Sequence, residues 1–297
     1  MRADGVKQQL KSGVYRALGE ATSGLRTSNG RLRPTLRVLM YHKVNDLSPN
    51  PATVPIAVFA EQMAPLAELG YVPVSLEAVL GHCLRAEALP ERAVLITFGD
   101  GYRDNLENAV PILRAHGYPA VVFVPVGYLD DGRPLPHEET LLGLGVRNPT
   151  LRWDDLAELE AAGVRVESHG VGHTPLTSLA PADALREIAL SKLRLEDRLG
   201  REVEAFAFVK GSRADFAPEH ASLARQAGYK LAFTSISGAN RLGSDPFRLR
   251  RYNVEPYPPR TFELVLAGAC DLVAIKDTVL GTRGRRVLNA VLGTASR

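Results

Sequence analysis

Residues 93–105 read Ala-Val-Leu-Ile-Thr-Phe-Gly-Asp-Gly-Tyr-Arg-Asp-Asn, a short apolar run that stops at a polar turn flanked by glycines. Such a run, rich in β-branched residues, is typical of a strand buried on both faces of a parallel sheet. The turn places Asp100 directly after this strand. Because the active sites of parallel α/β barrels lie at the carboxyl ends of the strands, we expect Asp100 to belong to a functional site.

The same alternation of short apolar runs and amphipathic segments continues from residue 36 onward. Expected strands are 37–41, 93–98, 120–124, 164–167, 205–208, 231–234 and 249–254, and expected helices include 57–69, 105–116, 153–162, 181–199 and 218–227. A glycine follows each of several helical segments, where a left-handed residue commonly ends a helix. The pattern predicts an α/β fold with a parallel sheet, and its number of units favours a distorted (β/α)7-type barrel in a single domain.

The two ends of the chain are expected to lie outside this barrel. We predict an amphipathic helix and a linker over residues 1–35, the barrel over 36–260 and a helical extension over 261–297. The N-terminal helix would pack on the barrel, with a membrane surface or a partner as the alternative. The C-terminal extension would cover the barrel, contact another copy of the chain or contact an anionic membrane.

Composition excludes several classes of function. The chain has 45% hydrophobic and 23% charged residues and a net charge of +3, as in ordinary globular proteins. Its Lys and Arg residues are mostly scattered, which argues against a nucleic-acid partner. No apolar run approaches the roughly 20 residues of a membrane span, and no signal-peptide pattern is evident. With two cysteines, the chain suits a reducing compartment, so we expect a cytoplasmic location.

Two histidines follow another expected strand. Residues 167–173 read Glu-Ser-His-Gly-Val-Gly-His, so His169 and His173 lie four apart in a glycine-containing loop. Neutral imidazoles bind zinc well, although this spacing alone is equally consistent with surface or capping histidines. Together with Asp100, two histidines would leave open coordination positions. That arrangement is typical of a catalytic metal and not of a structural one.

Several motifs in order resemble one known family. They include the residues around His42, the run 94–105, the histidine loop, residues 206–211 and residues 249–254. The chain resembles the polysaccharide deacetylases, the nodulation-type or family four carbohydrate esterases. It is most similar to the poly-N-acetylglucosamine deacetylase branch, whose members carry a Tyr-His near the start. The similarity spans roughly residues 36–254.

The resemblance implies roles for the matching positions. One divalent metal, zinc in the first instance, would be held by Asp100, His169 and His173. His42 would be the general acid toward the leaving amine. The groove, with a backbone N–H directed at the acyl oxygen, would include Phe208, Lys210 and Gly211. The substrate would be a small molecule or oligosaccharide with an N-acyl group, such as an acetylated amino sugar or a related biosynthetic intermediate.

The chain departs from the family pattern at the position of the catalytic base. The first Asp of the family's Thr-Phe-Asp-Asp-Gly motif is Gly99 here, and a Pro-Tyr pair has become Val209-Lys210. Three interpretations follow: a hydrolase with a substitute base, an inactive pseudo-deacetylase that binds a carbohydrate or partner, or a substitution introduced to disable the enzyme. Glu167 is the better substitute base than Lys210, because a carboxylate near a metal ion is readily ionised, although a structural pairing of Glu167 with Arg165 is at least as consistent with the sequence. We predict a metal-dependent hydrolase of N-acyl groups with Glu167 as its base.

Overall fold

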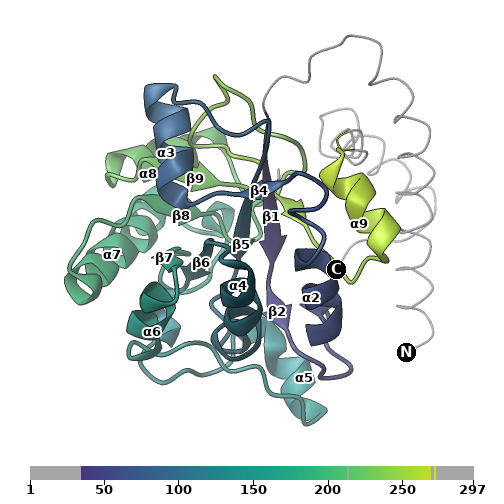
Figure 1. Cartoon of the computed structure of the whole chain (residues 1–297). Helices are drawn as coiled ribbons and strands as arrows, with labels where there is room; N and C mark the ends of the chain where they lie inside the picture. Colours follow the sequence, from purple (N-terminus) through teal and green to yellow (C-terminus); the bar gives the residue numbers. More distant parts are fainter. Residues whose placement is uncertain (1–34, 213, 269–270, 272–297) are drawn as a thin grey trace, which may run out of the picture.

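An eight-stranded parallel sheet forms the centre of the molecule (Figure 1). The structure is a computed structural model that describes residues 35–212, 214–268 and 271. The strands are β1 (Thr35–Tyr41), β4 (Val72–Pro73), β5 (Arg92–Phe98), β6 (Ala120–Val124), β7 (Val164–Ser168), β8 (Ala205–Ala207), β9 (Leu231–Phe233) and β10 (Tyr252–Asn253). Their order is β10-β1-β5-β6-β7-β8-β9, and β4 pairs with the start of β5.

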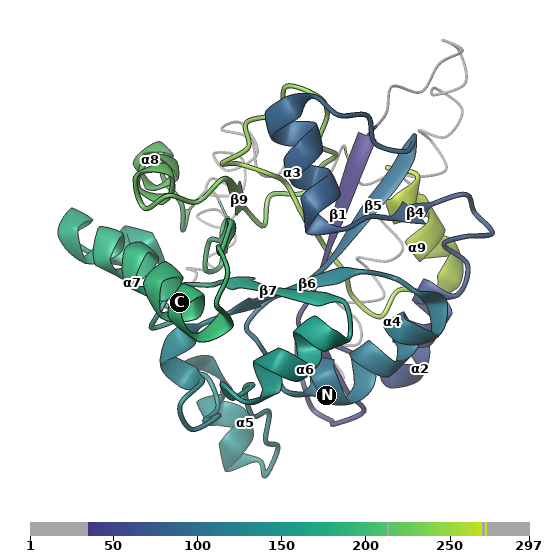
Figure 2. The ribbon, with the colours of Figure 1, turned by 60° about the vertical axis from the view of Figure 1, so that its left-hand side comes forward.

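The sheet curls until its two edge strands approach each other. Leu249, just before β10, forms a parallel bridge with Phe233 of β9, and Thr234 N donates to Leu249 O at 2.8 Å. Helices surround the curled sheet (Figure 2). The predicted distorted (β/α) barrel in one domain is therefore confirmed, and the expected strands occur at or near their predicted positions.

Alternate residues of the strands build two separate cores. Val38, Leu95 and Phe233 belong to a cluster with the inward residues of β6 and β8, and the ring of Phe123 lies 5.4 Å from that of Phe233. Because β6 and β9 are not neighbours in the sheet, this cluster fills the inside of the barrel. The intervening residues, such as Leu39, pack outward against the helices. A strand has a side-chain period of two, which explains why each strand serves both cores.

Helices and short segments connect the strands. The longer elements are α2 (Ile56–Met63), α3 (Leu76–Arg85), the π-helix η1 (Asn105–Ala109) leading into α4 (Val110–His116), α5 (Glu139–Gly143), α6 (Asp155–Ala161), α7 (Pro181–Leu199), α8 (Pro218–Gln226) and α9 (Pro259–Leu266). The short elements are β2 (Lys43–Val44), β3 (Thr53–Val54), η2 (Val126–Tyr128), η3 (Pro136–Glu138) and η4 (Leu176–Ser178). None of the helices within the described ranges is long and apolar enough to cross a membrane.

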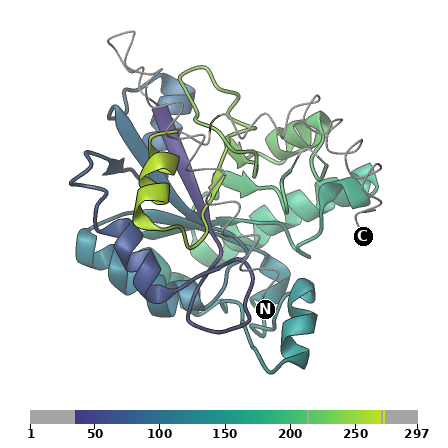
Figure 3. The ribbon, with the colours of Figure 1, turned by 90° about the vertical axis from the view of Figure 1, so that its right-hand side faces the viewer.

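The predicted terminal segments fall largely outside the described residues. The amphipathic helix and the linker up to residue 34 lie outside them, as does most of the segment after residue 268. Helix α9 begins at Pro259, just before the predicted start of the C-terminal extension, and it packs near α2 (Figure 3). The proposed contacts of the two extensions with another chain or a membrane stay predictions.

Candidate active site

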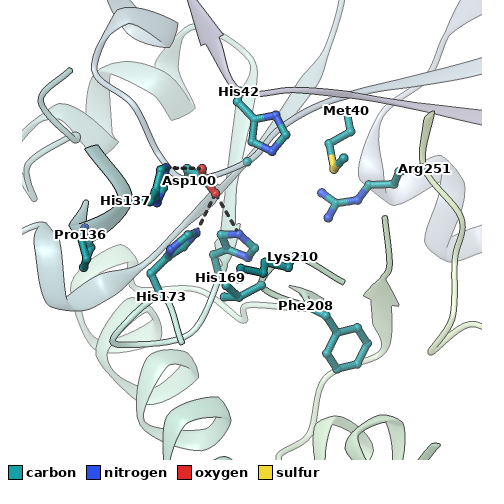
Figure 4. Close-up of a pocket in the computed structure, with 12 residues that line it drawn as sticks. Met40, His42, Asp100, Pro136, His137, His169, His173, Phe208, Lys210 and Arg251 are labelled. Carbon is teal, nitrogen blue, oxygen red and sulfur yellow. Dashed lines mark hydrogen bonds and ion pairs between the residues drawn. The ribbon is translucent and has the colours of Figure 1, made fainter. Parts of the chain in front are cut away.

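Three metal-binding side chains converge at the carboxyl ends of two strands. Asp100 follows β5, while His169 and His173 follow β7. The Oδ1 atom of Asp100 lies 3.2 Å from Nε2 of His169 and 2.9 Å from Nε2 of His173 (Figure 4). One ligand atom from each residue lies within 4.8 Å of the other two. The sequence prediction that these three residues meet is therefore correct.

The hydrogen bonds of His169 suit a metal ligand. Its Nδ1 atom lies 2.7 Å from the backbone oxygen of Ala207 in β8, an atom that can only accept. The proton of the neutral imidazole therefore sits on Nδ1, and Nε2 keeps the lone pair that a metal needs. With one carboxylate and two imidazoles as donors, the site fits a zinc-type ion and leaves coordination positions open.

The loop between the two histidines is held from two sides. The amides of Val171 and Gly172 donate to Oε1 of Glu187 in α7, at 2.8 and 2.5 Å. On the other side, the amide of Gly127 in η2 donates to Val171 O at 2.9 Å. A Cβ atom at Gly127 would lie 2.7 Å from that oxygen, so only glycine permits this approach. The position of His173 is thus fixed by main-chain contacts.

Backbone strain concentrates at the site. Asp100, His173 and Lys210 have φ values of 70°, 54° and 56°, in the left-handed region that non-glycine residues rarely adopt. All three line the same pocket, whereas two other residues with this conformation, Ala52 and Ala86, do not. Strained residues of this kind persist where the surrounding structure fixes them, and they often mark functional sites.

The charges in the site favour an ionised carboxylate at Asp100 and a neutral imidazole at His169. Burial tends to raise the pKa of Asp100, but its interactions with His173 and His169 outweigh this effect and hold its pKa well below the usual value. Burial lowers the pKa of His169, and the hydrogen bond to the Asp100 carboxylate opposes that shift only in part. These are the protonation states in which carboxylates and imidazoles bind metal ions.

The three ligands open into a cavity of about 310 Å³. It is lined by Met40, His42, Gly99, Asp100, Pro136, His137, His169, His173, Phe208, Val209, Lys210 and Arg251. This volume lies at the small end of the range for small-molecule sites, about 300–1,000 Å³. The pocket sits where a parallel barrel is expected to carry its active site.

Comparison with known proteins identifies the family. Residues 86–232 match the family described as polysaccharide deacetylase. The chain belongs to the polysaccharide deacetylase family. It is 27% identical over 221 residues to YxkH of Bacillus subtilis (strain 168), whose name places it among the polysaccharide deacetylases, covering 74% of this chain and 72% of YxkH. The resemblance drawn from the sequence motifs is confirmed.

Two further comparisons bear on the poly-N-acetylglucosamine branch. The poly-beta-1,6-N-acetyl-D-glucosamine N-deacetylase of Escherichia coli (strain K12) is 37% identical over 91 residues, which cover 30% of this chain and 13% of that protein. The structure of IcaB from Ammonifex degensii superposes with a TM-score of 0.67 at 25% identity, covering 80% of this chain and 97% of that one. The predicted likeness to this branch is borne out.

Gly99 lies where the resemblance expects a base, and His42 lies beside it. Strands β1 and β5 pair in register up to Tyr41 and Phe98, so the next residues of the two strands are neighbours. A Cβ atom at Gly99 would lie 3.0 Å from Cδ2 and 3.2 Å from Nε2 of His42. Gly99 does not have a left-handed φ, so the backbone itself would accept an aspartate there. The imidazole of His42 therefore borders the space that a carboxylate side chain would use.

The structure contradicts the prediction of Glu167 as a substitute base. Burial raises the pKa of Glu167 to about 7, a value that would suit a base, but its side chain does not reach the pocket. It is fully buried away from the pocket, where it pairs with Arg165 and Arg201 at 3.1 and 3.3 Å. The amide of Ala205 also donates to it at 2.7 Å. Glu167 and His169 are two residues apart and share a face of the chain, but these arginines and the amide at the start of β8 hold the carboxylate of Glu167 away from the ligands.

The predicted substrate-binding residues divide into two groups. Phe208 and Lys210 line the pocket, and the buried ring of Phe208 packs 4.5 Å from that of Phe216. Gly211 does not line it, and its amide donates to Val209 O at 2.6 Å. A Cβ atom at Gly211 would lie 2.9 Å from Phe208 O. This glycine allows the chain to turn after Lys210, and a contact of Gly211 with substrate stays a prediction.

Two residues of the pocket were missed in the sequence. His137 in η3 lies 2.9 Å from the hydroxyl of Tyr102 and 3.8 Å from Oδ2 of Asp100. That hydroxyl also donates to Glu138, which forms a buried ion pair with Lys43 at 2.8 Å. The segment around His137 has no periodic pattern, so nothing in the sequence placed it near the strand ends. Arg251 is the other: Arg250 and Arg251 near the last strand could meet a carboxylate or phosphate of a substrate, but the sequence favours exposed arginines there, and the structure places Arg251 in the pocket lining.

Proposed function

We propose that this polysaccharide deacetylase family member is a metal-dependent hydrolase that removes an N-acyl group, in the first instance N-acetyl, from an amino sugar. The observation that carries the proposal is the convergence of Asp100, His169 and His173, with Nε2 of each histidine within 3.2 Å of one carboxylate oxygen. Zinc is the proposed ion, because imidazole and carboxylate ligands in a site with open positions are those of catalytic zinc. The poly-N-acetylglucosamine deacetylase relatives support an acetylated amino sugar as substrate.

The residues around the ligands can carry the proton transfers. When bound, a divalent ion supplies Lewis acidity toward the acyl oxygen and makes a water molecule more acidic. Burial lowers the pKa of His42 to about 4, so its imidazole is neutral at pH 7 and starts as a proton acceptor. His42 can take the proton of the attacking water and return it to the amine as the C–N bond breaks. One residue would thus serve both the base step and the acid step.

A second candidate function is supported by Gly99. Among the described residues that line the pocket, Asp100 is the only carboxylate, and it belongs to the metal ligands. A chain that lost the base would bind an acetylated carbohydrate or a partner without turning it over. General-base catalysis typically contributes about 10²–10⁴-fold to the rate, so this loss decides between the two functions.

The test is acetate release by zinc-reconstituted protein. We expect turnover of β-1,6-linked N-acetylglucosamine oligomers, and a fall in kcat of about 10²-fold or more in His42→Gln with zinc content unchanged. His116→Gln is the matched control, because His116 is an exposed histidine at the end of α4. A zinc-loaded wild type that releases no acetate from oligomers or monomers, and a Gly99→Asp variant equally inactive, would establish the binding function instead.

A further inference from the structure

A buried arginine faces the pocket without an ion-pair partner among the described residues. Arg251 precedes β10, and only 2% of its surface is exposed. Its Nε atom donates to Thr234 O at 2.8 Å, and the guanidinium lies 5.5 Å from the centre of the Phe123 ring. The NH1 nitrogen is buried and has no hydrogen-bond partner in the part of the chain that the structure describes. Figure 4 shows the guanidinium pointing toward the middle of the pocket.

The other buried arginine of the described chain, Arg37, has the hydrogen-bond and ion-pair partners that a buried guanidinium normally has. Arg37 is 6% exposed, and its NH1 nitrogen donates to the Tyr252 hydroxyl at 2.6 Å and pairs with Asp271 at 3.2 Å. No carboxylate lies within 4 Å of the Arg251 nitrogens among the described residues. Burying a charged group without a partner is costly, so a guanidinium kept in this state calls for a partner that enters the pocket.

A second cation borders the same pocket. Lys210 is exposed, and no ion pair within 4 Å involves its amine in the described ranges. The single carboxylate among the lining residues, Asp100, is engaged by the two histidines and would be neutralised further by a metal ion. Compared with the family motifs that the sequence resembles, Gly99 removes a negative charge and Lys210 adds a positive one. Both departures make the pocket more positive.

We propose that the substrate carries an oxyanion, a carboxylate or a phosphate, close to its N-acyl group, and that Arg251 binds it with Lys210 as a second contact. A guanidinium donates to carboxylate and phosphate oxygens with well-matched geometry, and hydrogen bonds to charged groups are the strong ones. The cavity of about 310 Å³ suits one acidic acyl amino sugar unit. This inference rests on the proposed function and specifies its substrate class.

The test compares acetylated sugars that differ by one charged group. N-acetylmuramic acid and N-acetylglucosamine 6-phosphate each serve as the acidic partner of N-acetylglucosamine, one for carboxylate and one for phosphate. For the zinc-loaded wild type we expect kcat/KM to favour at least one acidic sugar by about tenfold to a hundredfold, the usual worth of a charged hydrogen bond. The preference should fall to near one in Arg251→Gln, and severalfold in Lys210→Gln.

The controls separate recognition from damage to the fold. Arg250→Gln removes the neighbouring arginine, which is exposed and does not line the pocket, so the preference should persist. Zinc content and thermal unfolding are measured for each variant. If Arg251→Gln does not fold, Lys210→Gln still tests the inference, because Lys210 is exposed and its replacement leaves the core intact. A preference unchanged in the variants would overturn the assignment.

Binding and turnover together distinguish the failure of this inference from the failure of the proposed function. The Kd of each sugar for the zinc-loaded protein is measured by calorimetry. Tighter binding of an acidic sugar without acetate release would sustain the oxyanion site and refute the hydrolase. Turnover of N-acetylglucosamine at the same kcat/KM as both acidic sugars would sustain the hydrolase and refute the oxyanion site. Raised salt should weaken the preference, because it screens the exposed Lys210.

Discussion

The two sides of the pocket differ in how closely they follow the motifs that the sequence resembles. The metal side consists of Asp100, His169 and His173, where each residue matches the resemblance and makes a polar contact. The substrate side consists of Gly99, His42, Lys210 and Arg251. There the chain has glycine and lysine where the resemblance expects a base and a tyrosine, and one buried guanidinium nitrogen has no partner within the described chain.

This difference indicates which part of the chemistry has been retained. The metal side depends on ligand geometry that small changes would destroy, because its histidine loop is held by main-chain hydrogen bonds. On the substrate side, the departures fall at positions to which the resemblance assigns proton transfer and sugar binding. If the pocket had lost all function, nothing would favour the presence of all three ligand residues on the metal side. The contrast therefore favours a retained metal with an altered substrate.

The largest effect is expected from breaking the metal side. His173→Ala removes one of three ligands, so zinc content should fall from one equivalent to near zero and acetate release should become undetectable. Elemental analysis of protein dialysed against trace zinc gives the result, with His116→Ala as the control. A variant that kept a full equivalent would show that the two sides of the pocket are not divided as described.

Placing a carboxylate at position 99 on the substrate side should give the next largest effect, on kcat. In Gly99→Ala the new Cβ atom would lie 3.0 Å from Cδ2 of His42, so the ring must shift and kcat should fall about tenfold. Gly99→Asp causes the same crowding but adds a carboxylate, which should raise kcat about 10²-fold above the alanine variant. The comparison is made at saturating zinc. Equal rates in the two variants would mean that position 99 no longer takes part in proton transfer.

Replacing Glu187, which supports the histidine loop from outside the pocket, is expected to have a smaller effect, on the affinity for zinc. Glu187→Ala leaves the amides of Val171 and Gly172 without their acceptor, so the loop that places His173 should loosen. Groups that orient metal ligands are typically worth about 10–100-fold in metal affinity, and the lower part of this range is expected here. Competition with a zinc chelator measures the change. Asp197→Ala, at an exposed position of the same helix, should leave affinity unaltered.

The smallest effect on catalysis is expected at Glu167. Glu167→Gln removes the charge that pairs with Arg165 and Arg201, so the free energy of unfolding should fall by about 1–3 kcal/mol. The kcat of the zinc-loaded variant should stay within about twofold of the wild type, because Glu167 does not reach the pocket. Urea unfolding and acetate release are measured on the same preparation. A large loss of kcat with normal stability would restore Glu167 as a base.

Much of the fold could be predicted because local signals agree with tertiary structure. Helix α7 was predicted with correct bounds, since Pro181 begins it and Gly200, with a φ of 66°, ends it. Strand β6 is a continuous apolar run and was also found as predicted. Helix α2 ends at Met63, before the predicted Leu69, because the amphipathic pattern continues through turns that are not helical. The short strands β2, β3 and β4 lack a recognisable pattern.

The candidate site could be predicted only where its residues follow strands. Asp100, His169 and His173 occur at strand ends, so topology alone brings them together. His137 reaches the pocket through a contact with Tyr102, which no sequence spacing encodes. Arg250 and Arg251 are adjacent in the sequence, and only packing decides that the first is exposed and the second buried. Glu167 was assigned by its chemistry, and only packing shows that Arg165, Arg201 and the amide of Ala205 hold its carboxylate away from the pocket.

The ligands of the metal side come from strands that are not neighbours in the sheet. Asp100 follows β5 and His169 follows β7, with β6 between them. An ion held by both would join these strands across a third, in a barrel whose edge strands meet around a bridge at Leu249. Zinc would then act as a folding ligand as well as a reagent. At a free concentration of 100 times its Kd, zinc would add about 2.7 kcal/mol to the stability of the native state. The supply of zinc would then determine what fraction of the protein stays folded.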